Sequence, residues 1–329
     1  MPDRRIFSGM QPSGRFHLGN YMGALKNWVD LQYDYECYFS IVDIHALTSS
    51  YSDTGQLKEN IFQMAVDWLS AGLDPQKNII FLQSQVKEHA ELHLYLSMNT
   101  PLSWLERVPT YKDKLQQLGA QGKDINTYGF LGYPVLMTAD IVLYKADYVP
   151  VGEDQIPHVE LSREMARRFN YLYGRVFPEP EALLTEAKIL PGIDGRKMSK
   201  SYDNCIPMGA EPEELREKVR QMITDPARVR KTDKGHPDVC TVYAFHKHFG
   251  GSVYENLRKE CESGAIGCVA CKKLLADNMI AALAPIHERR SYLLRKPQYI
   301  REVLEDGAGR ARQAAGETML AVREAMRLW

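Results

Sequence analysis

The sequence predicts an α/β fold, a doubly wound parallel sheet, followed by an all-helical C-terminal region. In the first half of the chain, short apolar runs rich in β-branched and aromatic residues alternate with helical patterns. Beyond Ser201 only helical patterns remain. Alternating strands and helices form a parallel sheet that binds ligands beyond the carboxyl ends of its strands. The 329 residues suffice for one large or two ordinary domains.

Four short segments are expected to be strands: residues 5–8, 38–43, 78–83 and 147–151. Residues 57–69 place apolar side chains on one face of a helix, and Gly72 is a reasonable stop for it. The pattern of residues 84–132 predicts an insertion that is more helical than the rest of the first half of the chain.

The second half of the chain predicts helices over residues 211–222 and 266–295. Pro212 would lie in a first helical turn, where proline is tolerated. We place a boundary near residue 203, which gives domains 1–202 and 203–329.

The composition is that of a globular protein, with 44% apolar residues, 25% charged residues and a net charge of −1. No run approaches the roughly 18 apolar residues of a membrane span. The N-terminus has no apolar segment of the secretory type. We therefore expect a cytoplasmic protein with no membrane partner and with reduced cysteines.

A short loop at residues 197–201 concentrates positive charge, because it reads Lys-Met-Ser-Lys-Ser and follows two glycines and Arg196. Such a tip suits a polyphosphate whose negative charge grows during a reaction. A solvated surface loop could have the same composition, so the loop is interpreted together with the N-terminus.

Residues 7–20 begin at the end of the first strand and read Phe-Ser-Gly-Met-Gln-Pro-Ser-Gly-Arg-Phe-His-Leu-Gly-Asn. Glycines let a ligand approach the backbone, and a helix N-terminus offers free N–H groups to phosphate. His17 can donate to a phosphate oxygen, although a lone histidine after a strand is more often structural. The sequence has neither a G-x-G-x-x-G nor a Walker motif, which weakens dinucleotide and P-loop interpretations.

These two segments together resemble the signatures of class I aminoacyl-tRNA synthetases. Residues 17–20 resemble the His-Ile-Gly-His signature, and residues 197–201 are identical to the second signature. Asn20 departs from the general pattern but is typical of the tryptophanyl branch. The segments 7–13, 41–46, 134–140 and 147–155 are also similar to tryptophanyl-tRNA synthetases. The resemblance implies a Rossmann-like catalytic domain and a helical anticodon-binding domain.

The resemblance also implies a two-step reaction. The carboxylate of L-tryptophan would attack the α-phosphate of ATP and release pyrophosphate, and tryptophan would then pass to the terminal ribose of tRNA(Trp). Mg²⁺ would accompany ATP without a dedicated protein cage. A homodimer is expected from the family alone.

By the same resemblance, four residues would be catalytic: His17 near the phosphates, Lys197 and Lys200 on the departing pyrophosphate, and Lys114 reaching the phosphates from the insertion. The other ATP contacts would come from Gln11, Pro12, Ser13, Gly19, Asn20, Gly152, Glu153, Asp154, Ile189, Met198, Ser199 and Ser201.

For the amino acid, Asp140 would accept a hydrogen bond from the indole N–H and so reject phenylalanine. A phenol is also a donor, so pocket shape would have to exclude tyrosine. The expected walls are Phe7, Tyr133, Met137 and Val151, and the expected polar contacts are His45 and Gln155. Met137 could equally be an ordinary core residue.

Cys240, Cys261, Cys268 and Cys271 follow the spacing C-x₂₀-C-x₆-C-x₂-C. Four thiolates are a ligand set for Zn²⁺ or an iron–sulfur cluster. Structural zinc sites favour two close pairs, and here only the last two cysteines form one. A subset of tryptophanyl-tRNA synthetases carries a [4Fe–4S] cluster on a similar spacing, so we expect this cluster, with Zn²⁺ or unligated cysteines as alternatives.

Residues 216–234 carry seven basic and three acidic side chains, which suits RNA contact or a solvated helix face. Two other functions stay open: a tyrosyl-tRNA synthetase, and a nucleotidyltransferase that never meets tRNA. The segment around Asp140 argues against the first, and the cysteine-bearing region would be superfluous in the second. His89 and His93 resemble half of a zinc-protease motif, but Ala90 replaces its glutamate, so we expect no metal there.

Overall fold

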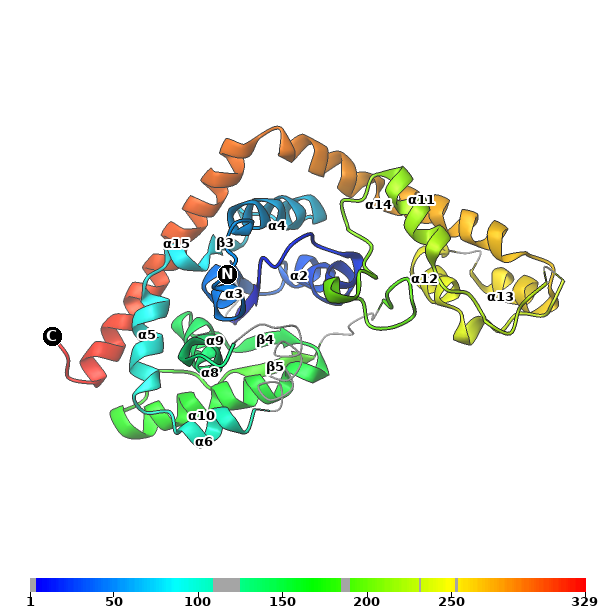
Figure 1. Cartoon of the computed structure of the whole chain (residues 1–329). Helices are drawn as coiled ribbons and strands as arrows, with labels where there is room; N and C mark the ends of the chain where they lie inside the picture. Colours follow the sequence, from blue (N-terminus) through cyan, green and yellow to red (C-terminus); the bar gives the residue numbers. More distant parts are fainter. Residues whose placement is uncertain (1–3, 109–124, 185–189, 231, 252–253) are drawn as a thin grey trace. The chain divides into compact units, whose positions relative to one another are not determined.

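The computed structural model describes residues 4–108, 125–184, 190–230, 232–251 and 254–329 (Figure 1). The chain divides into two compact units, each of which is described by itself. The first unit contains residues 1–14, 27–186 and 296–329, and the second contains residues 15–26 and 187–295.

The first unit is built on a five-stranded sheet in the order β3-β2-β1-β4-β5, in which every pair is parallel. The order reverses between β1 and β4, so the expected doubly wound fold is confirmed. Ile6 at this point lies opposite both Cys37 and Tyr148. The strands are β1 Arg5–Met10, β2 Glu36–Ile41, β3 Ile79–Leu82, β4 Tyr148–Val151 and β5 Glu181–Leu184.

The four expected strands exist, and their ends differ from the expected ones by at most two residues. Strand β5 is not among the predicted strands, because it has only four residues and no buried face. Its pairing with β4, in which Val149 lies opposite Ala182, forms the edge of the sheet. Such a strand depends on its neighbour rather than on its own pattern.

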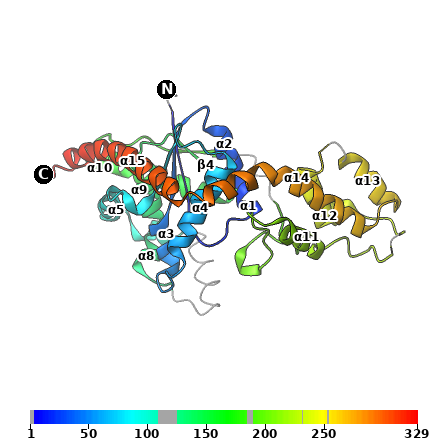
Figure 2. The ribbon, with the colours of Figure 1, turned by 90° about the horizontal axis from the view of Figure 1, so that it is seen from above.

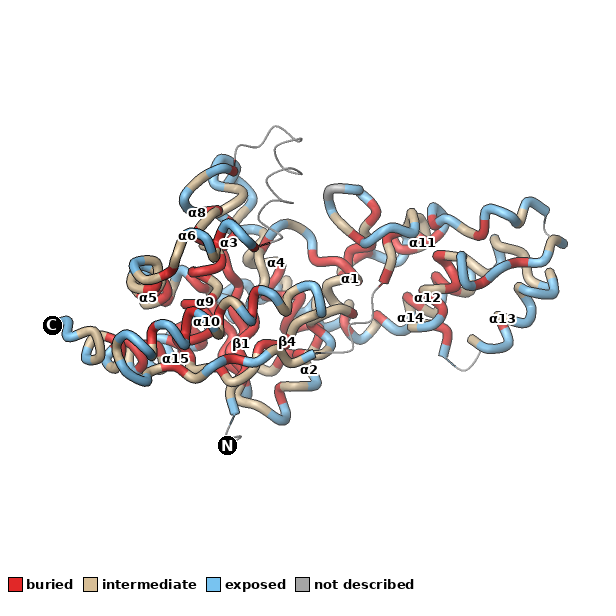
Figure 3. The backbone as a smooth tube through the Cα atoms, turned by 90° about the horizontal axis from the view of Figure 1, so that it is seen from below, coloured by how far each residue is buried: buried red, intermediate tan, exposed pale blue. Residues whose placement is uncertain are grey.

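Helices surround this sheet. The predicted helix over 57–69 is α4, and it ends at Gly72 in a left-handed conformation with φ of 114°. Helix α9 is almost entirely buried (Figure 3). The described helices are α2 Lys26–Leu31, α3 Asp43–Ser50, α4 Leu57–Ala71, α5 Glu88–Ser97, α6 Leu102–Glu106, α8 Tyr128–Leu131, α9 Tyr133–Leu143, α10 Ile156–Tyr173 and α15 Pro297–Ala325.

The C-terminal helix α15 belongs to the first unit, and it lies beside β3 and α5 (Figures 1 and 2). Gly307 packs directly on β3, because a Cβ there would overlap the carbonyl oxygen of Ile80. Arg310 donates to the carbonyls of Pro75 and Asn78 at 3.0 and 2.9 Å. The division of the chain into these two units therefore differs from the expected single boundary near residue 203.

The second unit is helical, and Pro212 begins α11 as expected. Residues 15–18 join it because the Leu18 N–H donates to the Ile206 carbonyl and the Met208 N–H donates to the Phe16 carbonyl, both at 2.9 Å. The helices are α1 Leu18–Asn20, α11 Pro212–Gln221, α12 Thr241–Phe249, α13 Tyr254–Ser263 and α14 Cys268–Leu294, with a π-helical segment at Tyr21–Leu25 and short 3₁₀ helices at Lys200–Tyr202 and Pro237–Val239.

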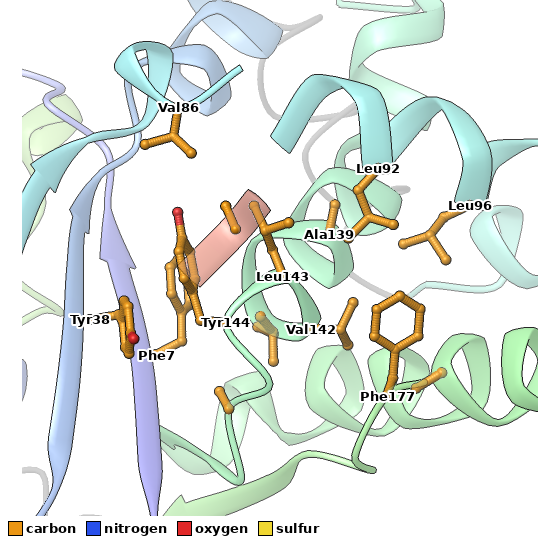
Figure 4. Close-up of a cluster of buried hydrophobic side chains, with 14 of the residues drawn as sticks. Phe7, Tyr38, Val86, Leu92, Leu96, Ala139, Val142, Leu143, Tyr144 and Phe177 are labelled. Atoms are coloured by element: carbon orange, nitrogen blue, oxygen red, sulfur yellow. The ribbon is translucent and has the colours of Figure 1, made fainter. Parts of the chain in front are cut away.

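Three aromatic side chains form the centre of the first unit's core (Figure 4). The Phe7 and Tyr144 rings stack at 5.7 Å between centroids, and the Tyr38 and Tyr144 rings stack at 4.6 Å. Such pairs contribute roughly 0.5–1.5 kcal/mol beyond the area they bury. Across the described residues, the structure contains no helix with the length and apolarity required to cross a bilayer.

Candidate functional site

Several of the expected site residues follow the carboxyl ends of the strands. Gln11, Pro12 and Ser13 come directly after β1, and residues 152–155 come directly after β4. The segment 11–13 borders a cavity of about 180 Å³ together with residues from 46 to 60. Gln155 donates to the Asp154 carboxylate at 3.2 Å. This edge is where open parallel sheets bind ligands.

Asp140 lies on α9 and is only 1% exposed. Its Oδ2 lies 3.0 Å from Nε2 of His45, which extends from α3. Nε2 of Gln83 donates to both carboxylate oxygens, at 2.8 and 2.9 Å. Nδ1 of His89 lies 2.6 Å from Oδ1, outside hydrogen-bond geometry. Three other elements therefore hold one buried carboxylate.

Burial alone would raise the pKa of Asp140, but the charge of the neighbouring His89 and the hydrogen bond from His45 outweigh burial and lower the pKa to about 2. The carboxylate is therefore ionised at neutral pH. An ionised, buried acceptor is suited to a ligand N–H donor.

The predicted amino-acid site contains both His45 and Asp140, and the structure brings the two together. Gln83 is absent from the prediction, although a polar residue directly after a buried strand is a usable signal. His89 resembles half of a metal motif in the sequence, and no spacing rule links it to Asp140. The His89 ring continues to Tyr144, whose hydroxyl lies 2.7 Å from Nε2 of His89.

The four expected walls of the amino-acid pocket lie in or beside the core. Phe7 is 4% exposed and stacks on Tyr144. Met137 and Val151 are partly buried against the same cluster. The Tyr133 ring packs 5.7 Å from that of His158.

His17 caps the short helix α1 in the second unit. Its Nδ1 accepts from the Asn20 N–H at 3.2 Å, and Oδ1 of Asn20 accepts from the His17 N–H at 3.3 Å. Burial, together with the charge of Lys200, lowers the pKa of His17 to about 4. The imidazole is therefore neutral at pH 7, with its proton on Nε2.

The two signature segments meet in this unit. The Gly19 N–H lies 3.4 Å from Sδ of Met198, whose side chain is 5% exposed. A Cβ on Gly19 would lie 3.0 Å from Nδ1 of His17 and 3.3 Å from that sulfur. Glycine at this position thus makes room for the histidine ring and the lysine loop.

All four expected metal ligands line one cavity of about 20 Å³, together with Arg228, which donates to Sγ of Cys261 at 3.7 Å. Burial first, and then the neighbouring thiols, raise the pKa of Cys271 to about 12. No three histidine, cysteine or acidic side chains of the described residues stand in a metal-holding arrangement. The four thiols suit a thiophilic metal in composition, and cation binding would have to displace their protons. Cys37 is buried in β2.

The basic stretch at 216–234 is partly neutralised by ion pairs. Arg216 lies 2.5 Å from Asp277, Lys218 lies 3.9 Å from Asp203, and Arg220 lies 2.8 Å from Glu217. Two further expected site residues, Lys114 and Ile189, lie outside the described residues.

Comparison with known proteins places these sites in context. The family of class I tRNA synthetases (W and Y) matches residues 2–284. The tryptophan–tRNA ligase of Thermotoga maritima is 51% identical, over 98% of this chain and 99% of that protein. The one from Aquifex aeolicus is 43% identical, over 98% and 100%. The crystal structure of a Campylobacter jejuni tryptophanyl-tRNA synthetase complexed with ADP and tryptophan superposes with a TM-score of 0.89 at 39% identity, covering 98% of this chain and 100% of that one.

Proposed function

Because the chain belongs to the family of class I tRNA synthetases (W and Y), we propose that it is a tryptophan–tRNA ligase, which joins L-tryptophan to tRNA(Trp) in an ATP-dependent reaction. The observation that carries this proposal is the likeness to tryptophan ligases along the full length of both chains. The ionised Asp140 of α9 and the lysine loop supply charged groups that such a reaction requires.

The reaction has two steps. The tryptophan carboxylate attacks the α-phosphorus of ATP, the bond to the bridging oxygen breaks, and pyrophosphate leaves with that electron pair. A hydroxyl of the terminal tRNA ribose then attacks the activated carbonyl carbon, and AMP leaves. No covalent enzyme intermediate is needed, so the protein contributes positioning and charge stabilisation.

His17, Lys197 and Lys200 act on the phosphates. The neutral imidazole of His17 donates its Nε2–H to a phosphate oxygen, and the two lysines neutralise charge on the departing pyrophosphate. Mg²⁺ enters with ATP. The remaining ATP contacts come from residues 11–13, 19–20, 152–154 and 198–201, with Lys114 and Ile189 proposed from the family resemblance alone.

Asp140 selects the amino acid by accepting the indole N–H. A carboxylate offers about four lone-pair sites, and Gln83 covers two of them with one amide group. If Gln83 releases one oxygen, a site opens for the indole. His45 and Gln155 contact the amino acid, and Phe7, Tyr133, Met137 and Val151 shape its surroundings.

For the four cysteines we propose a [4Fe–4S] cluster, with Zn²⁺ as the alternative. The support is the all-thiol donor set around one cavity, with the guanidinium of Arg228 beside it to offset thiolate charge. When bound, the group would brace the helices that carry or adjoin the cysteines, α12, α13 and α14. We propose that residues 203–329 recognise the anticodon and that residues 1–202 carry out adenylation.

We propose two further properties from the family resemblance. The active form is a homodimer in the cytoplasm. Sedimentation of the pure protein tests the assembly, and a monomer at micromolar concentration would contradict it.

The decisive experiment is ATP–pyrophosphate exchange with tryptophan, tyrosine and phenylalanine, followed by charging of total tRNA. We expect exchange with tryptophan only, and charging of one tRNA species. Exchange with tyrosine instead would make the chain a tyrosyl-tRNA synthetase. Exchange without any charging would favour a nucleotidyltransferase that does not use tRNA.

A further inference from the structure

Asn204 lies just beyond the lysine loop, residues 197–201, and outside its signature. Its side chain is only 2% exposed. Its Oδ1 accepts from the Ser199 N–H at 2.8 Å, and its Nδ2 donates to the Lys197 carbonyl at 3.1 Å. Nδ2 also donates to Oδ1 of Asp194 at 2.8 Å. One buried amide therefore holds the loop on both sides of Met198.

The backbone around this amide is shaped to admit it. A Cβ on Gly192 would overlap the Asn204 side chain, so only glycine fits there. The Ile193 N–H donates to the Asn204 carbonyl at 3.0 Å. Asp194 accepts from the Arg196 N–H at 3.1 Å while it accepts from Asn204. Residues 192–196, before the loop, and Asn204, three residues beyond it, thus form one hydrogen-bonded unit.

The consequence concerns the two lysines. The anchored groups, the Lys197 carbonyl and the Ser199 N–H, lie in the backbone that joins Lys197 to Lys200. Met198 between them is buried at 5% exposure against Gly19. The middle of the loop is thereby fixed at three successive residues, which sets the positions from which both lysine side chains extend.

We propose that Asn204 is a positioning residue that holds the Lys197–Lys200 backbone in the arrangement in which both ammonium groups meet the phosphates of ATP. This inference rests on the proposed role of the loop. The lysines act most strongly on charge that develops in the transition state, so their misalignment lowers kcat more than it weakens ATP binding. A displacement of about 1 Å can cost on the order of 100-fold in rate.

The test compares Asn204→Ala with Asn170→Ala in pyrophosphate exchange and in thermal unfolding. Asn170 is a matched control, because its side chain also makes three hydrogen bonds to a neighbouring turn: to the Phe177 carbonyl at 2.8 Å and from the N–H groups of Val176 and Phe177 at 2.9 and 3.0 Å. Both variants should lower Tm. Only Asn204→Ala should lower kcat, by roughly 10- to 100-fold with little change in the KM for ATP. A lower Tm with unchanged kcat would overturn the inference.

A double-mutant cycle separates this inference from the proposed function. In a Lys197→Ala/Lys200→Ala background, Asn204→Ala should have little further effect on kcat, because the groups it positions are gone. Full additivity would mean that Asn204 does not act through the lysines. If the lysine double variant itself exchanges pyrophosphate at the wild-type rate, the role assigned to the loop fails, and the role of Asn204 fails with it.

Discussion

The Nδ1 nitrogen of His17 accepts a hydrogen bond from the backbone N–H of Asn20, at 3.2 Å. That N–H is shared with the His17 carbonyl at 2.9 Å, and the Asn20 side chain returns a bond to the His17 N–H. The residue that departs from the general signature therefore completes a capping box. Because Nδ1 faces a donor, the proton of the neutral ring lies on Nε2 and is available to a ligand.

A His17→Asn variant should separate the cap from the chemistry. Asparagine is a good N-cap and keeps an acceptor for the helix, but it lacks the Nε2–H. We expect Tm close to wild type and pyrophosphate exchange lower by about 100-fold. His17→Ala should lose the cap as well, at about 1 kcal/mol of stability. Wild-type exchange by His17→Asn would remove the imidazole from the reaction.

The stability of the protein should depend on His17 in a defined pH window. Its pKa is about 4 when folded and 6.5 ordinarily, because it is buried and close to Lys200. Between these values the unfolded chain binds more protons, so stability falls as the pH is lowered from 6.5 towards 4. The free energy of unfolding, measured with urea at several pH values in this range, should depend less steeply on pH in His17→Asn than in the wild type. An equal pH dependence of the two proteins would contradict the assignment.

Tyr144→Phe should disturb the position of Asp140 indirectly, through His89. The lost hydroxyl leaves Nε2 of His89 buried without its partner at 2.7 Å, which costs about 1–3 kcal/mol. The KM for tryptophan should rise while that for ATP stays constant. Tyr38→Phe is the control, since the hydroxyl of Tyr38 donates to Glu36 at 2.8 Å and not to His89. An equal rise in the KM for tryptophan in both variants would refute the link.

Two glycines of α15 should respond oppositely to alanine. Gly307→Ala forces a methyl group into the Ile80 carbonyl, and we expect a loss of about 1–3 kcal/mol. Gly309 has open space around it, so Gly309→Ala should stabilise the helix by up to about 1 kcal/mol. Thermal unfolding of both variants measures these two changes in stability. A Gly307→Ala variant as stable as the wild type would mean that α15 does not pack on β3 this closely.

Metal removal should affect tRNA charging more than adenylation. Cys271→Ser should abolish bound iron, whereas Cys205→Ser should retain it, because Cys205 is half-buried and lies outside the cavity. Metal analysis and visible absorbance of both proteins give the first answer. If chelation of the metal lowered pyrophosphate exchange as much as tRNA charging, the cysteines would belong to the adenylation chemistry instead.

Local patterns gave much of this fold. The apolar face of residues 57–69, the stop at Gly72 and the first-turn Pro212 follow from chain-local chemistry, and each is present in the structure. Strand β5 was missed because four edge residues depend on β4 for their structure.

The sequence by itself determined the doubly wound sheet, the helical region and the two signature segments, because periodicity and short motifs are properties of neighbouring residues. Only the tertiary structure decided which side chains surround Asp140 and what holds the lysine loop. Gln83 and His89 lie 57 and 51 residues before Asp140 in the chain, and their contacts exist only after three elements pack together. The same holds for Gly307 and Ile80, whose close approach no local pattern encodes.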